Sequence, residues 1–326
     1  MLAVVLDSYG GPEVLTVREV PDPVPGPEEV VVDVVATALN RADLLQRRGL
    51  YPGPPMPQEI PGMELSGRVS ARGDRVTAWE LGDEVMGIVG GGAHAQRIAV
   101  HERQLMRVPE TVAVADAAAI PEVWITAYDA LVLQGGLTSG RTALVHAGGS
   151  GVGTAAIQIA KAIGARVIVT ASAGKLARCV ELGADVAVDY RVEDFVDSVR
   201  EATGGHGVDV VLDVVGGDYV DRNIEALRTG GRIVQVGVMG GGVAHVNVGR
   251  LLPKRASIIG TVLRSRPIEE KIALTQRFAA EILPLFDEGR CRPVIDSRFS
   301  LADIAAAHER MESNANVGKI LIDVAP

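Results

Sequence analysis

A glycine-rich turn at residues 145–156 is the feature of the sequence with the clearest chemical meaning. The segment reads Val-His-Ala-Gly-Gly-Ser-Gly-Val-Gly-Thr-Ala-Ala, follows an apolar strand pattern and opens a helical one. Glycines in that setting let the backbone approach a pyrophosphate, and the helix N-terminus offers free N–H groups and a partial positive charge. Ser150 stands where the strict G-x-G-x-x-G pattern has its middle glycine. We predict a dinucleotide site here, against the alternative of a turn that binds nothing.

The end of the second strand of this unit indicates which dinucleotide is bound. NAD-dependent enzymes place an acidic residue about 20 residues after the glycines, where it accepts hydrogen bonds from the ribose hydroxyls. Residues 167–176 read Val-Ile-Val-Thr-Ala-Ser-Ala-Gly-Lys-Leu and contain no acid. Ser172 and Lys175 could instead contact a 2′-phosphate, although a solvated lysine in the first turn of a helix is the alternative. The missing acid favours NADPH.

Strand and helix patterns alternate from Thr142 to Leu263, on both sides of the glycine-rich turn. Such alternation is typical of an α/β fold with a doubly wound parallel (Rossmann) sheet. The predicted strands are Thr142–Ala147, Arg166–Thr170, Val186–Asp189, Val208–Val215, Arg232–Val236 and Ser257–Leu263, with helices at Thr154–Ile163, Lys175–Leu182 and Asp194–Thr203 among them.

The rest of the chain predicts a second domain built from both ends of the sequence. The first 110 or so residues are rich in Gly and Pro around short Val-rich runs, which favours antiparallel strands. Beyond Arg266 come two helical patterns, Ile268–Phe286 and Leu301–Ser313, and a closing strand, Lys319–Val324. We expect this part to pack on the N-terminal strands. The predicted domains are therefore 1–119 with 266–326, and 120–265.

Charge and cysteine content exclude several classes of protein. A net charge of −9 argues against nucleic acid and anionic membranes as partners. Residues 142–160 lack charge, but their four glycines, His146 and Gln158 suit no lipid-facing helix. The first strand, Leu2–Leu6, is followed at once by Asp7, so we expect no signal peptide. Two cysteines cannot form a multi-bridge framework, and we predict a cytoplasmic protein.

The chain resembles the zinc-free zeta-crystallin/quinone oxidoreductase family of the medium-chain dehydrogenase/reductase superfamily. The resemblance covers essentially the whole chain and looks closest to the tumour-suppressor-inducible quinone oxidoreductase branch. It implies a GroES-like fold for the discontinuous domain. The segments that carry it are His146–Lys161, Ala38–Asp43, Ile60–Glu64, Gly237–Gly242, Leu263–Arg266 and Asn314–Lys319.

Cofactor-binding residues follow from the same matched segments. The resemblance implies that Lys175 and Tyr190 hold the adenosine phosphate end, while Gly151 and Val152, after Ser150, meet the pyrophosphate. Gly237, Val238 and Met239 would lie along the ribose–nicotinamide half, Leu263 would also contact the cofactor, and Asn316 would close the site. Without the resemblance, Tyr190 is an aromatic at a strand end and Asn316 a turn residue.

The resemblance also indicates which chemistry is missing. Zinc alcohol dehydrogenases of this superfamily bind the catalytic metal with two cysteines and a histidine, and the matching positions here are Asn40, Met63 and Glu122. An amide, a thioether and one carboxylate make no plausible zinc site. Without a Lewis acid, alcohol oxidation is a poor hypothesis. An acceptor that takes hydride readily, a quinone or an alkene conjugated to a carbonyl, is a better one.

Three residues near the N-terminus are the candidates for catalysis: Tyr51, Asn40 and Asp43. Tyr51 lies in a Gly/Pro-bounded loop and could hydrogen-bond the acceptor oxygen, or it is simply a loop tyrosine. Asn40 and Asp43 would position substrate or cofactor, although Asp43 could equally cap the helix that follows. Arg264 and Arg266 form a small basic spot that could contact phosphate, although we favour the interpretation that they belong to a surface loop.

Alternatives to a quinone reductase remain on the same scaffold. An enoyl or other activated-alkene reductase would have the same nucleotide half. A non-catalytic NADPH-binding structural or RNA-binding protein is the third hypothesis, although the acidic charge and the lack of a basic, aromatic stripe argue against RNA. The apolar run Ser257–Leu263 would be an exposed sheet edge in a monomer, so we predict a homodimer or a higher homo-oligomer.

Overall fold

The computed structural model describes residues 1–324. The chain forms two compact units, one from Met1–Glu122 together with the chain from Arg264 onward, and the other from Val123–Leu263. We call them the terminal unit and the central unit. No helix within residues 1–324 is long and apolar enough to cross a membrane.

The central unit is built on a six-stranded sheet in the order β10-β9-β8-β11-β12-β13, and every neighbouring pair is parallel. This confirms the predicted doubly wound sheet. Buried parallel strands are apolar along their whole length, and all five residues of β8 are buried. The strands are β8 (Thr142–His146), β9 (Arg166–Ala171), β10 (Val186–Asp189), β11 (Val208–Asp213), β12 (Leu227–Gln235) and β13 (Ser257–Gly260).

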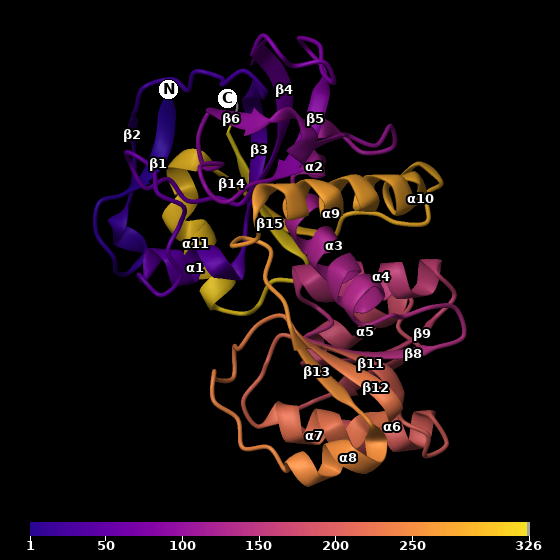
Figure 1. The fold of residues 1–326 in the computed structure, drawn as a ribbon. Coiled ribbons are helices and arrows are strands. Elements are labelled where there is room, and N and C mark those ends of the chain that lie inside the picture. The colour runs from indigo at the N-terminus through magenta and orange to yellow at the C-terminus, as the bar shows by residue number, and fades with distance from the viewer. Residues whose placement is uncertain (325–326) are drawn as a thin grey trace. The chain divides into compact units, whose positions relative to one another are not determined.

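Helices cover both faces of this sheet (Figure 1). Helices α4 and α5 lie on one face and α6, α7 and α8 on the other, each following the strand that it connects. The bounds of these helices are α4 (Gly151–Ala162), α5 (Ala173–Glu181), α6 (Phe195–Ala202), α7 (Tyr219–Ala226) and α8 (Leu251–Lys254). Helix α3 (Pro121–Tyr128), continued by a π-helical turn at Asp129–Gln134, begins at the boundary between the two units.

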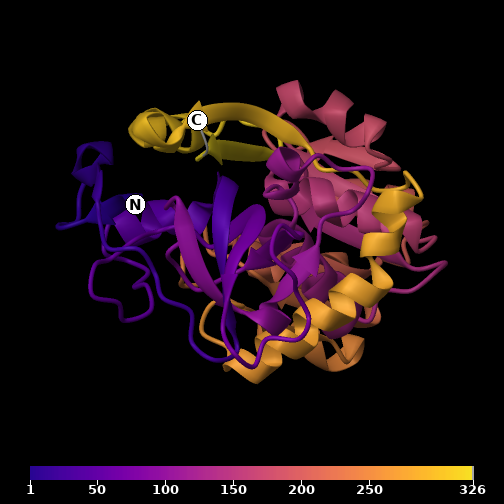
Figure 2. The ribbon, with the colours of Figure 1, turned by 90° about the horizontal axis from the view of Figure 1, so that it is seen from above.

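The terminal unit carries a seven-stranded, mainly antiparallel sheet in the order β14-β15-β3-β4-β5-β7, with β6 also paired to β3. The last strand pairs with an early one, because Ile320 of β15 lies opposite Leu39 of β3. Indigo N-terminal and yellow C-terminal strands therefore belong to the same unit in both views (Figures 1 and 2). This confirms the predicted discontinuous β domain.

The elements of the terminal unit have the following bounds. Its strands are β1 (Leu2–Leu6), β2 (Leu15–Glu19), β3 (Glu29–Leu39), β4 (Glu64–Arg72), β5 (Glu84–Ile88), β6 (Arg97–His101), β7 (Leu105–Arg107), β14 (Ile295–Ser300) and β15 (Lys319–Asp323). Its α-helices are α1 (Arg41–Arg47), α2 (Val114–Ala117), α9 (Ile268–Glu281), α10 (Leu283–Asp287) and α11 (Ile304–Glu312).

Several predicted elements differ from those observed, either in their bounds or by a break inside them. The helical pattern Ile268–Phe286 is two helices, α9 and α10, because Pro284 stands in the first turn of α10 and has no N–H for a continuous helix. The predicted strand Ser257–Leu263 ends as β13 at Gly260. The helix break lies inside the predicted element and the strand error at its end, and apolar periodicity alone marks neither.

Candidate cofactor and active site

The glycine-rich turn connects β8 to α4 and presents a helix N-terminus. Ser150 is the N-cap: its Oγ accepts from Gly153 N at 3.0 Å and donates to Ala147 O at 2.7 Å. A Cβ on Gly153 would come within 2.3 Å of Ala147 O, so only glycine fits there. The N–H groups of Gly151 and Val152 have no partner in the described chain. They are donors of the kind that binds an anion.

Lys175 lies directly over this turn. A Cβ on Gly149 would meet Lys175 Cδ at 2.7 Å, so the aliphatic part of the lysine packs on the glycine. Ser172 is the N-cap residue of α5, and its carbonyl accepts from Lys175 N at 2.8 Å. The structure thus brings Ser172 and Lys175 to the glycine-rich turn.

The other predicted cofactor residues of the central unit follow the carboxyl ends of its strands. Tyr190 comes immediately after β10 and is 45% exposed. After β12, Gly237 leads into Val238 and Met239, whose side chains are about half exposed. Leu263 lies beyond β13 and is half-buried. Carboxyl ends of parallel strands are where such sheets bind ligands.

A buried ion pair is the centre of the candidate site in the terminal unit. Lys319 Nζ lies 2.7 Å from Glu64 Oε1, and both side chains are almost fully buried. Asn40 joins the two: its Oδ1 accepts from Lys319 at 2.6 Å, and its Nδ2 donates to Glu64 Oε1 at 2.8 Å. The carboxylate also accepts from Glu122 N at 2.8 Å. Four segments of the chain are therefore joined at one buried charge pair.

The Asp43 carboxylate accepts hydrogen bonds from two backbone N–H groups. Its Oδ2 accepts from Asn40 N at 2.7 Å, which caps α1, and its Oδ1 accepts from Gly62 N at 3.3 Å. The side chain is fully buried. Asn316, also buried, donates from Nδ2 to Gly318 O at 3.0 Å, just before β15. The catalytic roles predicted for Asn40 and Asp43 stay predictions, since both side chains are engaged within the unit.

Tyr51 is the least buried of the three candidates for catalysis. The residue is half-buried, and its hydroxyl makes no hydrogen bond within residues 1–324. Burial raises the pKa of Tyr51, while the positive charge of Arg264 opposes the shift. The side chain is therefore a neutral phenol at physiological pH, with a proton to donate.

Arg264 lies over the Tyr51 ring, with its guanidinium carbon 5.0 Å from the ring centroid. It donates to Gly90 O at 2.6 Å, Gln46 Oε1 at 2.7 Å and Tyr51 O at 3.3 Å. Burial lowers the pKa of Arg264 from its usual value. Arg264 lies in a turn, as expected for a loop residue, but it is half-buried there and its partners are 174 to 218 residues away in sequence.

The residues at the expected metal position do not suit zinc. Asn40 Oδ1 accepts from the Lys319 ammonium, which would repel a cation, and Met63 offers only a thioether. Within residues 1–324 no group of three His, Cys, Asp or Glu side chains is arranged to hold a metal. These residues therefore do not suit a zinc ion at this position.

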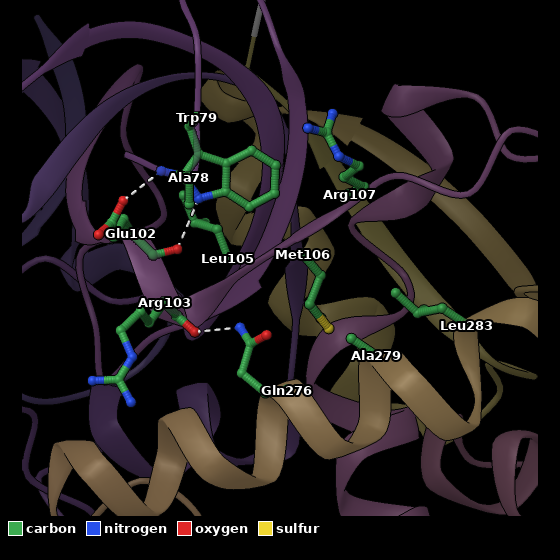
Figure 3. A pocket seen from close by; sticks show the side chains of 10 residues that line it. All are labelled: Ala78, Trp79, Glu102, Arg103, Leu105, Met106, Arg107, Gln276, Ala279 and Leu283. Carbon is green, nitrogen blue, oxygen red and sulfur yellow. Dashed lines mark hydrogen bonds between the residues drawn. The ribbon is translucent and has the colours of Figure 1, made fainter. Parts of the chain in front are cut away.

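A separate hollow of about 450 Å3 lies in the terminal unit between β7 and α9 (Figure 3). Trp79 lines it and donates from Nε1 to Glu102 O at 2.8 Å, while the Arg107 guanidinium lies 5.2 Å from the indole centroid. None of the predicted site residues contributes to this hollow.

Comparisons with known proteins match most of the chain. Two family models match: the alcohol dehydrogenase GroES-like domain over residues 26–110 and the zinc-binding dehydrogenase over residues 151–280. The quinone oxidoreductase of Pseudomonas aeruginosa is 35% identical over 321 residues, which are 97% of this chain and 97% of that protein.

Solved structures extend the likeness to the fold. The structure of Escherichia coli quinone oxidoreductase complexed with NADPH has a TM-score of 0.90 at 31% identity, and the match covers 99% of this chain and 100% of that one. An NAD-dependent alcohol dehydrogenase has a TM-score of 0.88 at 34% identity and is covered completely by this chain.

Proposed function

Since the chain belongs to the medium-chain dehydrogenase/reductase superfamily, with quinone oxidoreductases among its relatives, we propose that it is an NADPH-dependent reductase that transfers hydride to a quinone. NADPH binding and oxidoreductase chemistry follow from those relatives. The quinone is our more specific assignment, and so are a cytoplasmic location and the tumour-suppressor-inducible branch.

The observation that carries the quinone assignment is the Lys319–Asn40–Glu64 group. An ammonium stands beside the amide at the position where a metal ligand is expected, so this site lacks the Lewis acid that alcohol oxidation needs. A quinone already accepts hydride readily. The protein then has to orient the two reactants, exclude water and donate a hydrogen bond to the oxygen that gains negative charge.

We assign the residues of the central unit to the cofactor. Bound NADPH supplies the hydride. Lys175 and Ser172 would hold the 2′-phosphate, and the free N–H groups of Gly151 and Val152 would meet the pyrophosphate. The other cofactor contacts of this unit would come from Ser150, Tyr190, Gly237, Val238, Met239 and Leu263.

In the terminal unit we assign Tyr51 to the acceptor. Its phenol would donate to the quinone oxygen, and Arg264 would fix the loop by holding the carbonyl oxygens of Tyr51 and Gly90. Asn40 and Asp43 would keep the neighbouring backbone in place, and Asn316 would close the site.

The experiment is NADPH oxidation, followed at 340 nm, with a panel of benzoquinones, naphthoquinones, enones and primary alcohol–aldehyde pairs. We expect turnover with quinones and one NADPH consumed per quinone reduced. Reduction of enones alone would reassign the protein as an activated-alkene reductase. Flat traces for every acceptor, from protein that still binds NADPH, would favour the non-catalytic alternative and overturn the proposal.

A further inference from the structure

A chain of buried hydrogen bonds crosses the carboxyl edge of the central sheet. His146, the last residue of β8, has Nδ1 2.9 Å from Thr170 Oγ1 of β9 and Nε2 2.7 Å from Asn223 Oδ1 of α7. Asn223 Nδ2 donates to Asp213 Oδ2, at the end of β11, at 2.9 Å. All four side chains are at most 2% exposed. We call these residues the His146 network.

The direction of every bond in this network is determined by its last member. The Asp213 carboxylate can only accept, so the Asn223 amide must turn its Nδ2 toward it and its Oδ1 toward His146. His146 therefore carries its proton on Nε2, and its Nδ1 accepts from the Thr170 hydroxyl. Burial keeps the pKa of His146 below its usual value, in keeping with a neutral ring.

The network ends on the segments that we assign to the cofactor. Asp213 Oδ1 accepts from Val215 N at 2.6 Å and Gly216 N at 3.0 Å. Val215 O in turn accepts from Gly240 N at 2.7 Å, which holds the segment 237–240. At the other end, Thr170 O accepts from Gly148 N of the glycine-rich turn at 2.9 Å. One buried set of bonds thus positions two separate loops.

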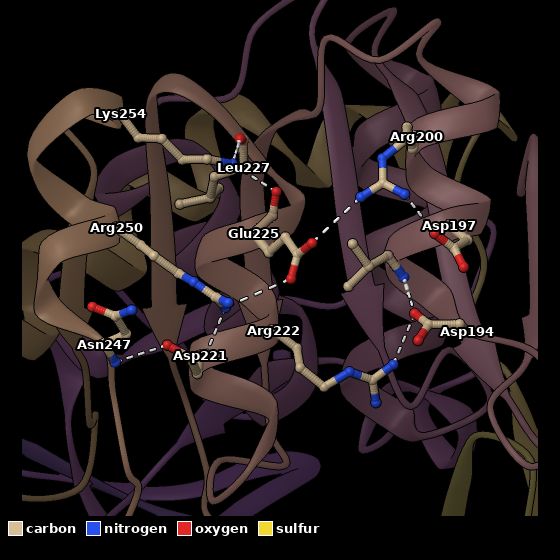
Figure 4. Close-up of polar contacts among 11 residues, drawn as sticks. Asp194, Asp197, Arg200, Asp221, Arg222, Glu225, Leu227, Asn247, Arg250 and Lys254 are labelled. Carbon is tan, nitrogen blue, oxygen red and sulfur yellow. Dashed lines mark hydrogen bonds and ion pairs between the residues drawn. The ribbon is translucent and has the colours of Figure 1, made fainter.

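An aromatic cover closes the network from the side of α6 and α7. The rings of Phe195 and Tyr219 meet His146 edge-on, with centroids 4.8 and 4.9 Å away. The Arg222 guanidinium lies 4.3 Å from the Phe195 centroid and donates to Asp194 at 2.9 Å (Figure 4). This cover makes water a poor substitute for a lost bond.

We propose that the His146 network sets the affinity for NADPH by holding the glycine-rich turn and the segment 237–240 in their binding geometry before the cofactor arrives. The proposal rests on the cofactor site assigned above. His146, Thr170 and Asn223 are positioning residues that act through backbone and touch no ligand. Loops that must be ordered on binding cost affinity, whereas loops held by a buried network do not.

The test compares two variants of the central unit. His146→Phe keeps an aromatic ring but leaves Asn223 Oδ1 and the Thr170 hydroxyl without their partner. Thr203→Ala is the matched control: its hydroxyl donates to Val199 O and accepts from Gly207 N, at the end of α6 rather than at the carboxyl edge. Both variants lose buried or half-buried bonds, and both should melt at a lower temperature.

NADPH affinity, measured by fluorescence titration of the folded protein, separates a positioning role from a merely structural one. We expect His146→Phe to raise the Kd for NADPH about tenfold, and Thr203→Ala to leave it unchanged. Adenosine 2′,5′-bisphosphate lacks the nicotinamide half and does not use the segment 237–240. Its affinity should therefore fall less than threefold in His146→Phe.

Several outcomes would overturn the proposal. A melting temperature that falls in His146→Phe while the Kd for NADPH stays within twofold would assign the network to folding alone. If His146→Phe does not fold, Thr170→Val removes one hydrogen bond without changing the shape of the side chain. We expect Thr170→Val to raise the Kd for NADPH about threefold, and Thr170→Ser, which keeps the hydroxyl, to have the wild-type Kd. An unchanged Kd in Thr170→Val would then refute the proposal. Lys175→Ala distinguishes failure of this proposal from failure of the cofactor site on which it rests. An unchanged Kd for NADPH in Lys175→Ala would refute the cofactor site.

Discussion

Replacing Tyr51 by phenylalanine tests the assigned active site most directly. The change removes one hydroxyl, which makes no hydrogen bond within residues 1–324, and leaves the ring that lies 5.0 Å from the Arg264 guanidinium. The folded protein therefore loses nothing that holds it together, and we expect an unchanged melting temperature. Any loss of rate then belongs to the reaction and not to the fold.

The expected loss of rate follows from the surroundings of Tyr51. Removing a donor to a developing oxyanion costs on the order of a hundredfold in a dry site. Tyr51 is only half-buried, so water can partly replace its hydroxyl. A quinone also accepts hydride more readily than an ordinary carbonyl compound, so it depends less on a hydrogen-bond donor. We expect about a five- to thirtyfold loss, which corresponds to about 1–2 kcal/mol in the barrier.

The assay is stopped-flow hydride transfer with saturating NADPH and excess quinone, together with the Kd for NADPH as a control. We expect the rate to fall and the Kd to stay the same, because the bond forms mainly in the transition state. Burial raises the pKa of Tyr51, so the wild-type rate should also be flat from pH 7 to 9. An unchanged rate in Tyr51→Phe would refute the role of this phenol as a donor.

Four further predictions rest on separate features of the chain. Lys175→Ala should weaken NADPH about tenfold or more in equilibrium titration and leave NADH almost unchanged, since a charge-assisted contact to phosphate is lost; equal losses would contradict this. Elemental analysis should find no stoichiometric zinc and chelators should leave activity intact, because Lys319 stands beside Asn40; bound zinc would reopen alcohol dehydrogenation. Light scattering should report at least a dimer, since β13 is an edge strand with Ile258 42% exposed, and a monomer at micromolar concentration would exclude pairing through this edge. Urea unfolding should show lower stability at pH 5.5 than at pH 7.5: burial lowers the pKa of His94 and His308, the latter to about 2, so below about pH 6.5 the unfolded chain takes up protons that the folded one does not. Equal free energies of unfolding would show that these rings are not held neutral.

Features that depend on neighbouring residues could be predicted from the sequence. The glycine-rich turn, the strand before it and the helix after it are signals within a dozen residues, and the alternation that follows predicts the parallel sheet. Ser172 and Lys175 are near the turn because β9 and α5 follow it in a standard order. Periodicity is sufficient for the order of strands and helices in the central unit, although not for the bounds of every strand.

Features that depend on distant contacts could not be predicted in this way. Arg264 follows β13 but has its partners in α1, at Gln46, and in the loops at Tyr51 and Gly90, and no local pattern marks such contacts. Glu64 and Lys319 are ordinary charged residues at strand starts until the sheet pairs β15 with β3. His146 was visible in the glycine-rich segment, but nothing nearby shows that Asn223, 77 residues later, completes its hydrogen bonds.

The pairing of β15 with β3 also has a consequence for the order of events during synthesis. Lys319 leaves the ribosome 279 residues after Asn40, which corresponds to roughly 15 to 60 s at ordinary elongation rates. Throughout that interval Glu64 lacks its buried counter-charge, so the nascent N-terminal segment must keep this carboxylate hydrated. The whole of β8–β13 is made before Lys319 appears, and the central sheet can form first. The pairing of β15 with β3, and with it the Glu64–Lys319 ion pair, can form only after that part of the chain has been made.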